Sequence, residues 1–140
     1  MKHLNWCKTA RQKQITPKGD WNVWLILAGR GWGKTRTGAQ DVAFYGLTRP
    51  NSRIAIVTPT FGDGRDTCIE GVSGLLGCID RDNIENWNRS IGELILKNGT
   101  IYRTFSAEQP DRLRGPQFHR AWCDEVGAWK SGDTWDQLLF

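Results

Sequence analysis

The chain has 140 residues, with 19 Lys and Arg against 15 Asp and Glu, so its formal net charge is +4 at pH 7. This length suffices for one hydrophobic core, and the mild positive excess permits contact with nucleic acid without requiring it. No apolar stretch approaches the roughly 20 residues of a membrane span, and the first residues lack the apolar run of a signal peptide. The four cysteines (positions 7, 68, 78 and 123) form no Cys-x-x-Cys pair, which argues against zinc or disulfide frameworks and favours free thiols in a reducing cytoplasm.

Residues 1–20 read as a polar, basic lead-in segment, and residues 21–140 as one domain. The apolar run Trp21–Ala28 predicts a first strand, which breaks into the loop Ala28-Gly29-Arg30-Gly31-Trp32-Gly33 before Lys34-Thr35. This layout is typical of a phosphate-binding loop at the start of a helix. The alternative is a glycine turn between a strand and a helix.

The residue types in this loop suit phosphate chemistry. Glycines let several backbone N–H groups point at one anion, and the following helix adds its positive N-terminal end. Lys34 can reach the β- and γ-phosphates, and the Thr35 hydroxyl can ligate Mg²⁺. Ala28 stands where the usual pattern has its first glycine, and a residue this small still fits. Arg30 can contact phosphate from within the loop, or it can hold the loop through a salt bridge.

Further elements follow in chain order. Helical spacing runs from Thr35 to about Leu47, and Arg53–Val57 reads as a buried strand. A short helix near 62–70, a glycine-rich turn over 71–77 and a strand at 84–88 come next. Residues 93–97 and 100–105, joined by Asn98-Gly99, predict a hairpin with a type I′ turn. A polar loop over 106–116, a strand ending at Cys123 and an amphipathic segment over 134–140 complete the chain.

The pair Asp124-Glu125 ends the last predicted strand. In P-loop ATPases a strand-end aspartate serves Mg²⁺, so Asp124 would hold the metal, and Glu125 would orient and deprotonate the attacking water. Alone, such a pair is more often a solvated strand end. Together with the glycine loop it predicts an ATP site, with the two strands expected side by side in the sheet.

These elements predict an α/β fold with a parallel central sheet and an additional antiparallel hairpin. The phosphate loop and the carboxylates would both follow strands, at the sheet edge where such folds place their ligands.

With both motifs in place, the chain resembles the ATPase domain of phage large terminase subunits, the DNA-packaging motors. The resemblance covers nearly the whole chain from Trp21 and rests on the following segments: Trp24–Thr35, Ile56–Thr60, Glu70–Leu76 and, most specific to the family, Ser106–Pro116. It implies a P-loop NTPase core of the RecA-like, additional-strand type, with ATP and Mg²⁺ as ligands.

The resemblance also implies hydrolysis coupled to translocation of double-stranded DNA into a procapsid. The expected partners are a portal protein, a small terminase subunit and further copies of the chain in a ring, in the host cell cytoplasm and at no membrane. An arginine would act on the neighbouring subunit's γ-phosphate. Arg114 is favoured and Arg112 is the second choice, the alternative being an exposed loop that contacts solvent or DNA. Related ATPases place a base-reading glutamine upstream, near Gln12 or Gln14, although a surface glutamine is the simpler interpretation.

The family continues beyond the matched region with a Thr- or Ser-rich coupling strand and a nuclease domain. The chain therefore resembles a truncated ATPase domain, for which we expect nucleotide binding with little or no turnover. Two alternatives stay open. One is another P-loop translocase of the helicase type, and the other is a non-catalytic terminase remnant that only binds nucleotide.

Overall fold

The computed structural model describes residues 2–139. The α-helices are α1 (Lys2–Thr9), α2 (Lys34–Thr48), α3 (Phe61–Asp63), α4 (Leu75–Cys78) and α5 (Asp133–Leu139). Short 3₁₀ turns are η1 (Gln12–Gln14), η3 (Arg81–Asn83), η4 (Pro110–Leu113) and η5 (Val126–Ala128), and a π-helical turn, η2 (Gly64–Ile69), continues α3. The strands are β1 (Arg53–Thr58), β2 (Ile84–Asn88), β3 (Glu93–Leu96), β4 (Ile101–Ser106) and β5 (Arg120–Cys123). No helix in this part of the chain is long and apolar enough to cross a membrane.

The strands form one mixed sheet in the order β2-β3-β4-β1-β5. Strands β4, β1 and β5 run parallel, whereas β3 pairs antiparallel with β4 and β2 antiparallel with β3. The predicted α/β class, with a parallel core and an added antiparallel hairpin, is therefore confirmed. The predicted helix after the glycine loop, the strand at 53–57, the strand at 84–88 and the hairpin strands all form.

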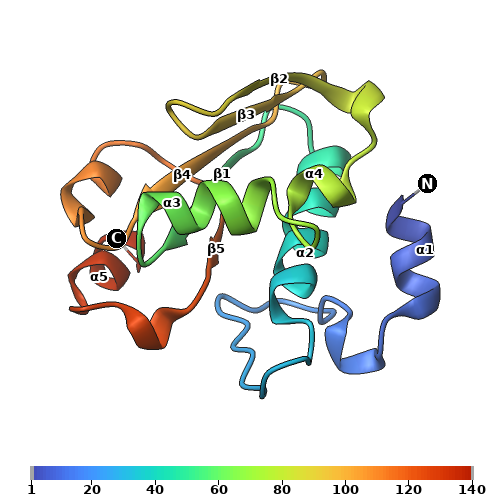
Figure 1. The fold of residues 1–140 in the computed structure, drawn as a ribbon, viewed down its shortest axis with the longest axis horizontal. Coiled ribbons are helices and arrows are strands. Elements are labelled where there is room, and N and C mark those ends of the chain that lie inside the picture. The colour runs from blue at the N-terminus through green and yellow to red at the C-terminus, as the bar shows by residue number, and fades with distance from the viewer. Residues whose placement is uncertain (1, 140) are drawn as a thin grey trace.

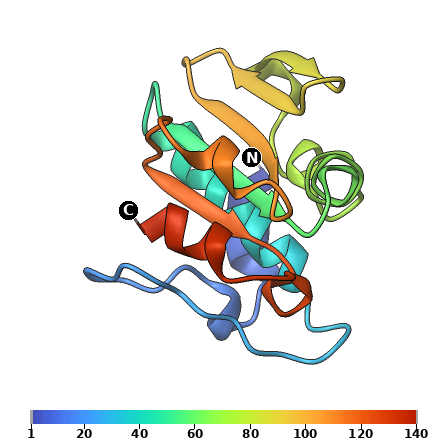
Figure 2. The same cartoon turned by 90° about the vertical axis from the view of Figure 1, so that its left-hand side faces the viewer.

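Helices cover both faces of this sheet (Figures 1 and 2). On one face α2, η2 and α4 pack against alternate residues of the strands, among them Ile54, Ile56, Tyr102 and Trp122. On the other face, η4 and α5 pack near Ala55, Val57 and Phe105 through Leu113 and Leu138. Because β1 is buried on both faces, its apolar run is continuous, as expected for a central parallel strand.

Two glycines let α2 approach the sheet closely. A Cβ atom on Gly38 would lie 2.2 Å from the Nε1 atom of Trp122, and one on Gly46 would lie 2.2 Å from the Tyr102 hydroxyl. The Tyr102 hydroxyl donates a hydrogen bond to the carbonyl oxygen of Val42 at 2.8 Å. The glycine spacing of α2 thus fixes how near the helix lies to β4 and β5.

The turn at Asn98-Gly99 differs from the type I′ turn that we predicted. Leu96 and Thr100 enclose a three-residue loop in which Gly99 has φ +89°, while Asn98 stays outside the positive-φ region. The Asn98 amide donates instead to the carbonyl oxygen of Gly46 in α2 at 2.8 Å. A turn rule treats the hairpin in isolation and cannot include this contact with a helix.

The predicted strand Trp21–Ala28 does not form. The segment is extended coil, and Val23, Leu25 and Leu27 are 51%, 69% and 84% exposed. Within residues 2–139, β5 pairs only with β1, so the expected pairing of the pre-loop strand with the Asp-Glu strand is also wrong. A strand needs a hydrogen-bonding neighbour. Here a cavity of about 1150 Å³ lies between residues 21–28 and the β5 edge. Figure 2 shows the coil running past the β5 side of the molecule.

Candidate functional site

The glycine loop leads directly into α2. Gly31 and Gly33 have φ values of +76° and +90°, conformations that residues with a Cβ rarely adopt. Gly33 forms the N-cap of α2 in the left-handed conformation, and its carbonyl oxygen accepts from the Thr37 N–H at 2.9 Å. No hydrogen bond within residues 2–139 uses the N–H groups of residues 29–36. A set of free donors at the start of a 15-residue helix is suited to an anion.

Lys34 folds back onto this loop. Its Nζ donates to the carbonyl oxygen of Ala28 at 2.6 Å and approaches that of Gly29 at 3.4 Å. Thr35 beside it is half-buried, and Arg30 is exposed and forms no ion pair in the described part of the chain. The salt bridge considered for Arg30 is therefore absent here.

Gln14 supports the loop from the outside, a role that the sequence did not single out. Its side chain is only 7% exposed, and its Nε2 donates to the carbonyl oxygen of Trp32 at 2.6 Å. Its Oε1 accepts from the Arg11 N–H at 2.9 Å, and the Arg11 guanidinium also donates to the Trp32 carbonyl oxygen. The interpretation of Gln14 as an ordinary surface residue is wrong, because tertiary packing of η1 against the loop buries it.

Asp124 and Glu125 follow β5 at the carboxyl end of the parallel strands. The Asp124 N–H donates to the carbonyl oxygen of Val57 at 2.9 Å, and the Trp129 indole donates to the Asp124 carbonyl oxygen at 3.2 Å. Glu125 is exposed and adopts φ +51° and ψ +46°. A left-handed conformation at a residue other than glycine is uncommon and concentrates at functional sites.

The surroundings of Asp124 disfavour its negative charge. Burial raises the pKa of its carboxyl, and the neighbouring Glu125 and Asp63 carboxylates raise it further. The Lys34 ammonium and a contact from the Cys68 thiol act in the opposite direction on this pKa. Lys34 and Asp124 therefore share one electrostatic environment although they are 90 positions apart in sequence. A cation placed here would offset the cost of the buried carboxylate.

The helix formed by α3 and η2 makes another wall of this site. Cys68 lies fully buried on η2, with its Sγ 3.9 Å from the Asp124 carboxylate, and burial raises the pKa of its thiol. The Asp63 N–H is capped by the Thr60 hydroxyl at 3.2 Å. Cys68 belongs to the core cluster on one face of the sheet, and Cys123 packs against the cluster on the other face. Neither Asp63 nor Cys68 belongs to a recognisable motif, so their position beside Asp124 could not be predicted from the sequence.

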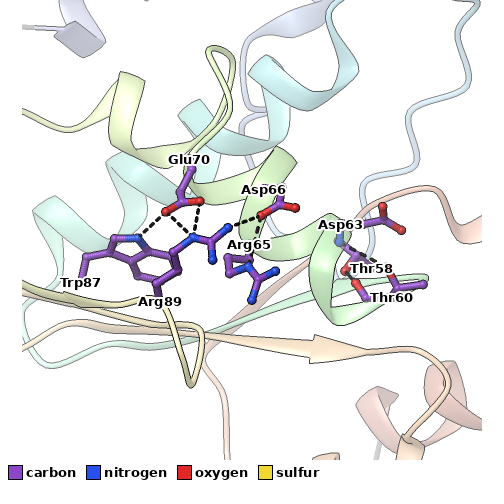
Figure 3. Close-up of polar contacts among 8 residues, drawn as sticks. All are labelled: Thr58, Thr60, Asp63, Arg65, Asp66, Glu70, Trp87 and Arg89. Carbon is purple, nitrogen blue, oxygen red and sulfur yellow. Dashed lines mark hydrogen bonds and ion pairs between the residues drawn. The ribbon is translucent and has the colours of Figure 1, made fainter.

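An ion-pair network ties this helix to the loop after β2 (Figure 3). The Arg89 guanidinium donates to Glu70 at 2.9 Å and to Asp66 at 3.1 Å. Hydrogen bonds from Trp87 and Arg89 lower the pKa of the Glu70 carboxyl. The network holds the C-terminal part of η2 against β2, and Cys68 lies on the same turn.

The candidate arginines lie on the loop before β5. Arg114 is 66% exposed and lies 3.5 Å from the Asp111 carboxylate, and Arg112 is also exposed. Arg114 lines the same cavity of about 1150 Å³ as Ala28, Lys34, Asp124 and Glu125. Residues 29–33 and Thr35 adjoin this cavity without lining it. The structure thus brings together the lysine, both carboxylates and one arginine.

Comparison with known proteins shows which family this chain belongs to. Residues 25–139 match the family model described as terminase large subunit, T4likevirus-type, N-terminal. No curated protein matches the chain. The fold is similar to the large terminase ATPase domain of Thermus phage P74-26, with a TM-score of 0.63 and 21% identity over 79% of this chain and 51% of that one. An arginine-to-alanine mutant of the same domain gives a TM-score of 0.59 and 22% identity over 79% of this chain and 50% of that one.

The chain thus spans about half the length of the solved terminase ATPase domains that it resembles. The family match covers most of the sequence, including the glycine loop and the Asp-Glu pair. The protein belongs to the family of phage large terminase subunits of the T4-like type, as part of their N-terminal region.

Proposed function

We propose that this chain forms the nucleotide-binding part of a DNA-packaging motor that hydrolyses ATP with Mg²⁺. One observation carries the proposal. Lys34, at the start of α2, lines the same cavity as the Asp124-Glu125 pair, and the N–H groups of its neighbours in residues 29–36 have no hydrogen-bond partner within residues 2–139. An NTP site combines groups that donate hydrogen bonds to the phosphates with carboxylates at the end of a neighbouring strand. Family membership supports ATP as the ligand.

Each residue has a role in this proposal. The loop over Ala28–Gly33 and Lys34 bind the phosphates, for which Lys34 exchanges the Ala28 carbonyl oxygen for phosphate oxygens. Thr35 and Asp124 hold Mg²⁺, which neutralises charge developing on the phosphates. Glu125 orients water and accepts its proton. No three His, Cys, Asp or Glu side chains cluster to hold a metal within the described residues, so the nucleotide phosphates would complete the coordination.

The wider assembly is also part of the proposal. Hydrolysis would drive double-stranded DNA into a procapsid in the host cell cytoplasm, with the portal protein, the small terminase subunit and further copies of the chain as partners. Arg114, which is exposed and lines the cavity, would reach the γ-phosphate bound by the next subunit, with Arg112 as the second candidate. Family membership and the exposure of both arginines support this arrangement.

A second candidate function is nucleotide binding without turnover. Two observations favour it. The Lys34 ammonium already donates hydrogen bonds to carbonyl oxygens of the loop, and Glu125 is exposed to solvent. A catalytic glutamate generally works in a site closed to bulk water. The two candidates share the binding step and differ in hydrolysis.

Melting of the chain with Mg²⁺ and a slowly hydrolysed ATP analogue tests the binding step. A ligand at 100 times its Kd stabilises the folded protein by about 2.7 kcal/mol, and this raises the Tm by several degrees. Lys34→Ala should abolish the shift and Lys97→Ala, which alters an exposed lysine far along the chain, should preserve it. A chain that shows no shift, or equal shifts in both variants, would contradict the proposal.

Phosphate release then separates turnover from binding alone. Hydrolysis is supported if the unaltered chain releases phosphate and Glu125→Gln abolishes the release while the analogue still raises the Tm of this variant. If the unaltered chain releases no phosphate, the second candidate is supported. Stimulation by single-stranded DNA, with none by portal or procapsid, would favour a helicase-type translocase instead.

A further inference from the structure

The net positive charge of this protein is concentrated in its first residues. Residues 1–19 hold five of the 19 Lys and Arg, at positions 2, 8, 11, 13 and 18, and no Asp or Glu. The other fourteen Lys and Arg are matched by all 15 carboxylates. The net positive charge of the chain therefore resides in α1, η1 and the turn that follows.

The fold directs three of these cations outward. In α1 the His3 ring stacks on Phe44 of α2 with centroids 4.2 Å apart, while Lys8 is exposed. In η1 Gln14 is buried against the glycine loop, while Lys13 is exposed. Lys18, also exposed, precedes Gly19, which has φ +92°.

No ion pair in the described part of the chain involves Lys8, Lys13 or Lys18. Among the side chains that the structure describes, the exposed large hydrophobic residues begin at Val23, beyond this segment. Protein interfaces are built around buried apolar or aromatic anchors. Unpaired cations without such anchors suit a polyanion, whose phosphates they neutralise with release of counterions.

We infer that residues 2–18 of the lead-in segment form a contact surface for the phosphate backbone of double-stranded DNA, with Lys8, Lys13 and Lys18 as the contacting side chains. The choice of duplex DNA as the polyanion rests on the proposed function. The inner side of the segment holds the glycine loop, through Gln14 and Arg11 on the Trp32 carbonyl oxygen. DNA on its outer side would thus lie one layer of chain away from the nucleotide site.

Fluorescence anisotropy with a labelled 30-base-pair duplex of arbitrary sequence, between 50 and 200 mM NaCl, tests the inference. The test variant is Lys8→Glu, Lys13→Glu and Lys18→Glu combined. The matched control is Arg53→Glu, Arg81→Glu and Lys97→Glu, which makes the same change in net charge at exposed positions outside the segment. Arg11 stays unaltered in both, since it contacts the glycine loop.

The test variant should bind the duplex at least about ten-fold more weakly than the unaltered chain at 50 mM NaCl. The slope of its log binding constant against log salt concentration should flatten by about one per lysine. The control should keep the salt slope of the unaltered chain. Equal weakening in both variants, unchanged binding in the test variant, or no duplex binding by the unaltered chain would each overturn the inference. If charge reversal prevents folding, the Lys→Gln triple replaces it under the same criteria.

Melting with the Mg²⁺–ATP analogue keeps the two proposals apart. A test variant that retains the nucleotide shift while its DNA binding falls supports both. A nucleotide shift that persists with unaltered DNA binding overturns only the DNA surface, whereas no shift in any variant, the unaltered chain included, overturns the nucleotide site.

Discussion

The Gln14 side chain donates a 2.6 Å hydrogen bond to the main-chain carbonyl oxygen of Trp32, which joins the lead-in segment to the glycine loop across 18 positions. The amide oxygen of Gln14 accepts from the Arg11 N–H, so both ends of the side-chain amide are hydrogen-bonded. Gln14 acts on this loop as a positioning residue.

Replacing Gln14 should therefore loosen the loop. We expect Gln14→Ala to lower the free energy of unfolding by about 1–2 kcal/mol, because it removes the side-chain hydrogen bonds of Gln14 and leaves the Trp32 carbonyl oxygen with the Arg11 guanidinium alone as its side-chain donor. It should also weaken binding of the ATP analogue, measured by calorimetry. Gln12→Ala, at an exposed position of the same turn η1, is the control and should change neither quantity. Equal effects of the two variants would show that the bond to Trp32 does not position the loop.

The close approach of α2 to β5 gives a second prediction. A Cβ on Gly38 would meet the Trp122 ring at 2.2 Å, and Trp122 is only 7% exposed and has little room to move. We expect Gly38→Ala to destabilise the fold by about 1–3 kcal/mol in urea denaturation, since overpacking forces the helix or ring to shift. Gly62→Ala, where the nearest atom lies 3.9 Å away, should be neutral or slightly stabilising. A Gly38→Ala variant as stable as the unaltered chain would contradict this packing.

The raised pKa of Asp124 predicts a dependence of stability on pH. A carboxyl whose native pKa lies above its unfolded value of 3.8 stabilises the fold when protonated, and this contribution is lost as the pH rises through the native pKa. At pH 7 the ionised Asp124 therefore lowers the stability of the ligand-free protein.

Asp124→Asn should then raise the Tm of the ligand-free chain at pH 7, and the gain should shrink as the pH falls toward 4. The same variant should lose the Tm shift given by Mg²⁺ and the ATP analogue. Asp20→Asn, at an exposed position, serves as the control for a lost surface charge. Melting curves between pH 4 and 8 check this, and an Asn variant that melts below the unaltered chain at pH 7 would refute it.

The ion pair between Asp41 and Arg120 anchors the coil before the glycine loop. Arg120 donates to both Asp41 carboxylate oxygens at 2.8 and 2.9 Å. Its guanidinium lies 4.8 Å from the ring centroid of Trp21 and 4.7 Å from that of Tyr45. Since this pair is mostly buried, we expect Asp41→Ala to cost about 3 kcal/mol of unfolding free energy, because it leaves Arg120 without its partner.

The pair between Lys130 and Glu108 provides the comparison. Its side chains are 82% and 47% exposed, so Glu108→Ala should cost less than about 1 kcal/mol. Denaturant titrations of both variants measure the difference. Similar losses in the two would mean that burial and the aromatic rings add nothing to the Asp41 pair.

The sequence predicted correctly those elements that depend on residue type and on neighbours along the chain. The alternation and apolar runs of β1, β3 and β4 reflect burial of one or both faces, and the Asn-Gly pair marks a hairpin wherever it lies between two such runs. The α2 helix begins after Gly33 because glycine accepts the left-handed N-cap that this loop requires. The candidate loop and the Asp-Glu pair were recognisable since both are short, local motifs.

Other features depended on contacts between distant segments. Val23, Leu25 and Leu27 have the composition of a strand, yet a strand forms only where a neighbouring backbone offers its hydrogen bonds, and the β5 edge lies across a cavity. The turn at Asn98 differs from the predicted type I′ turn because the Asn98 side chain donates a hydrogen bond to the Gly46 carbonyl oxygen of α2. Gln14 and Cys68 acquired their places beside the loop and Asp124 through packing alone. The sequence by itself therefore determined the local elements and the residue types of the candidate site. Only the tertiary structure decided which strands pair and which side chains meet, because both depend on distances between segments that are remote along the chain.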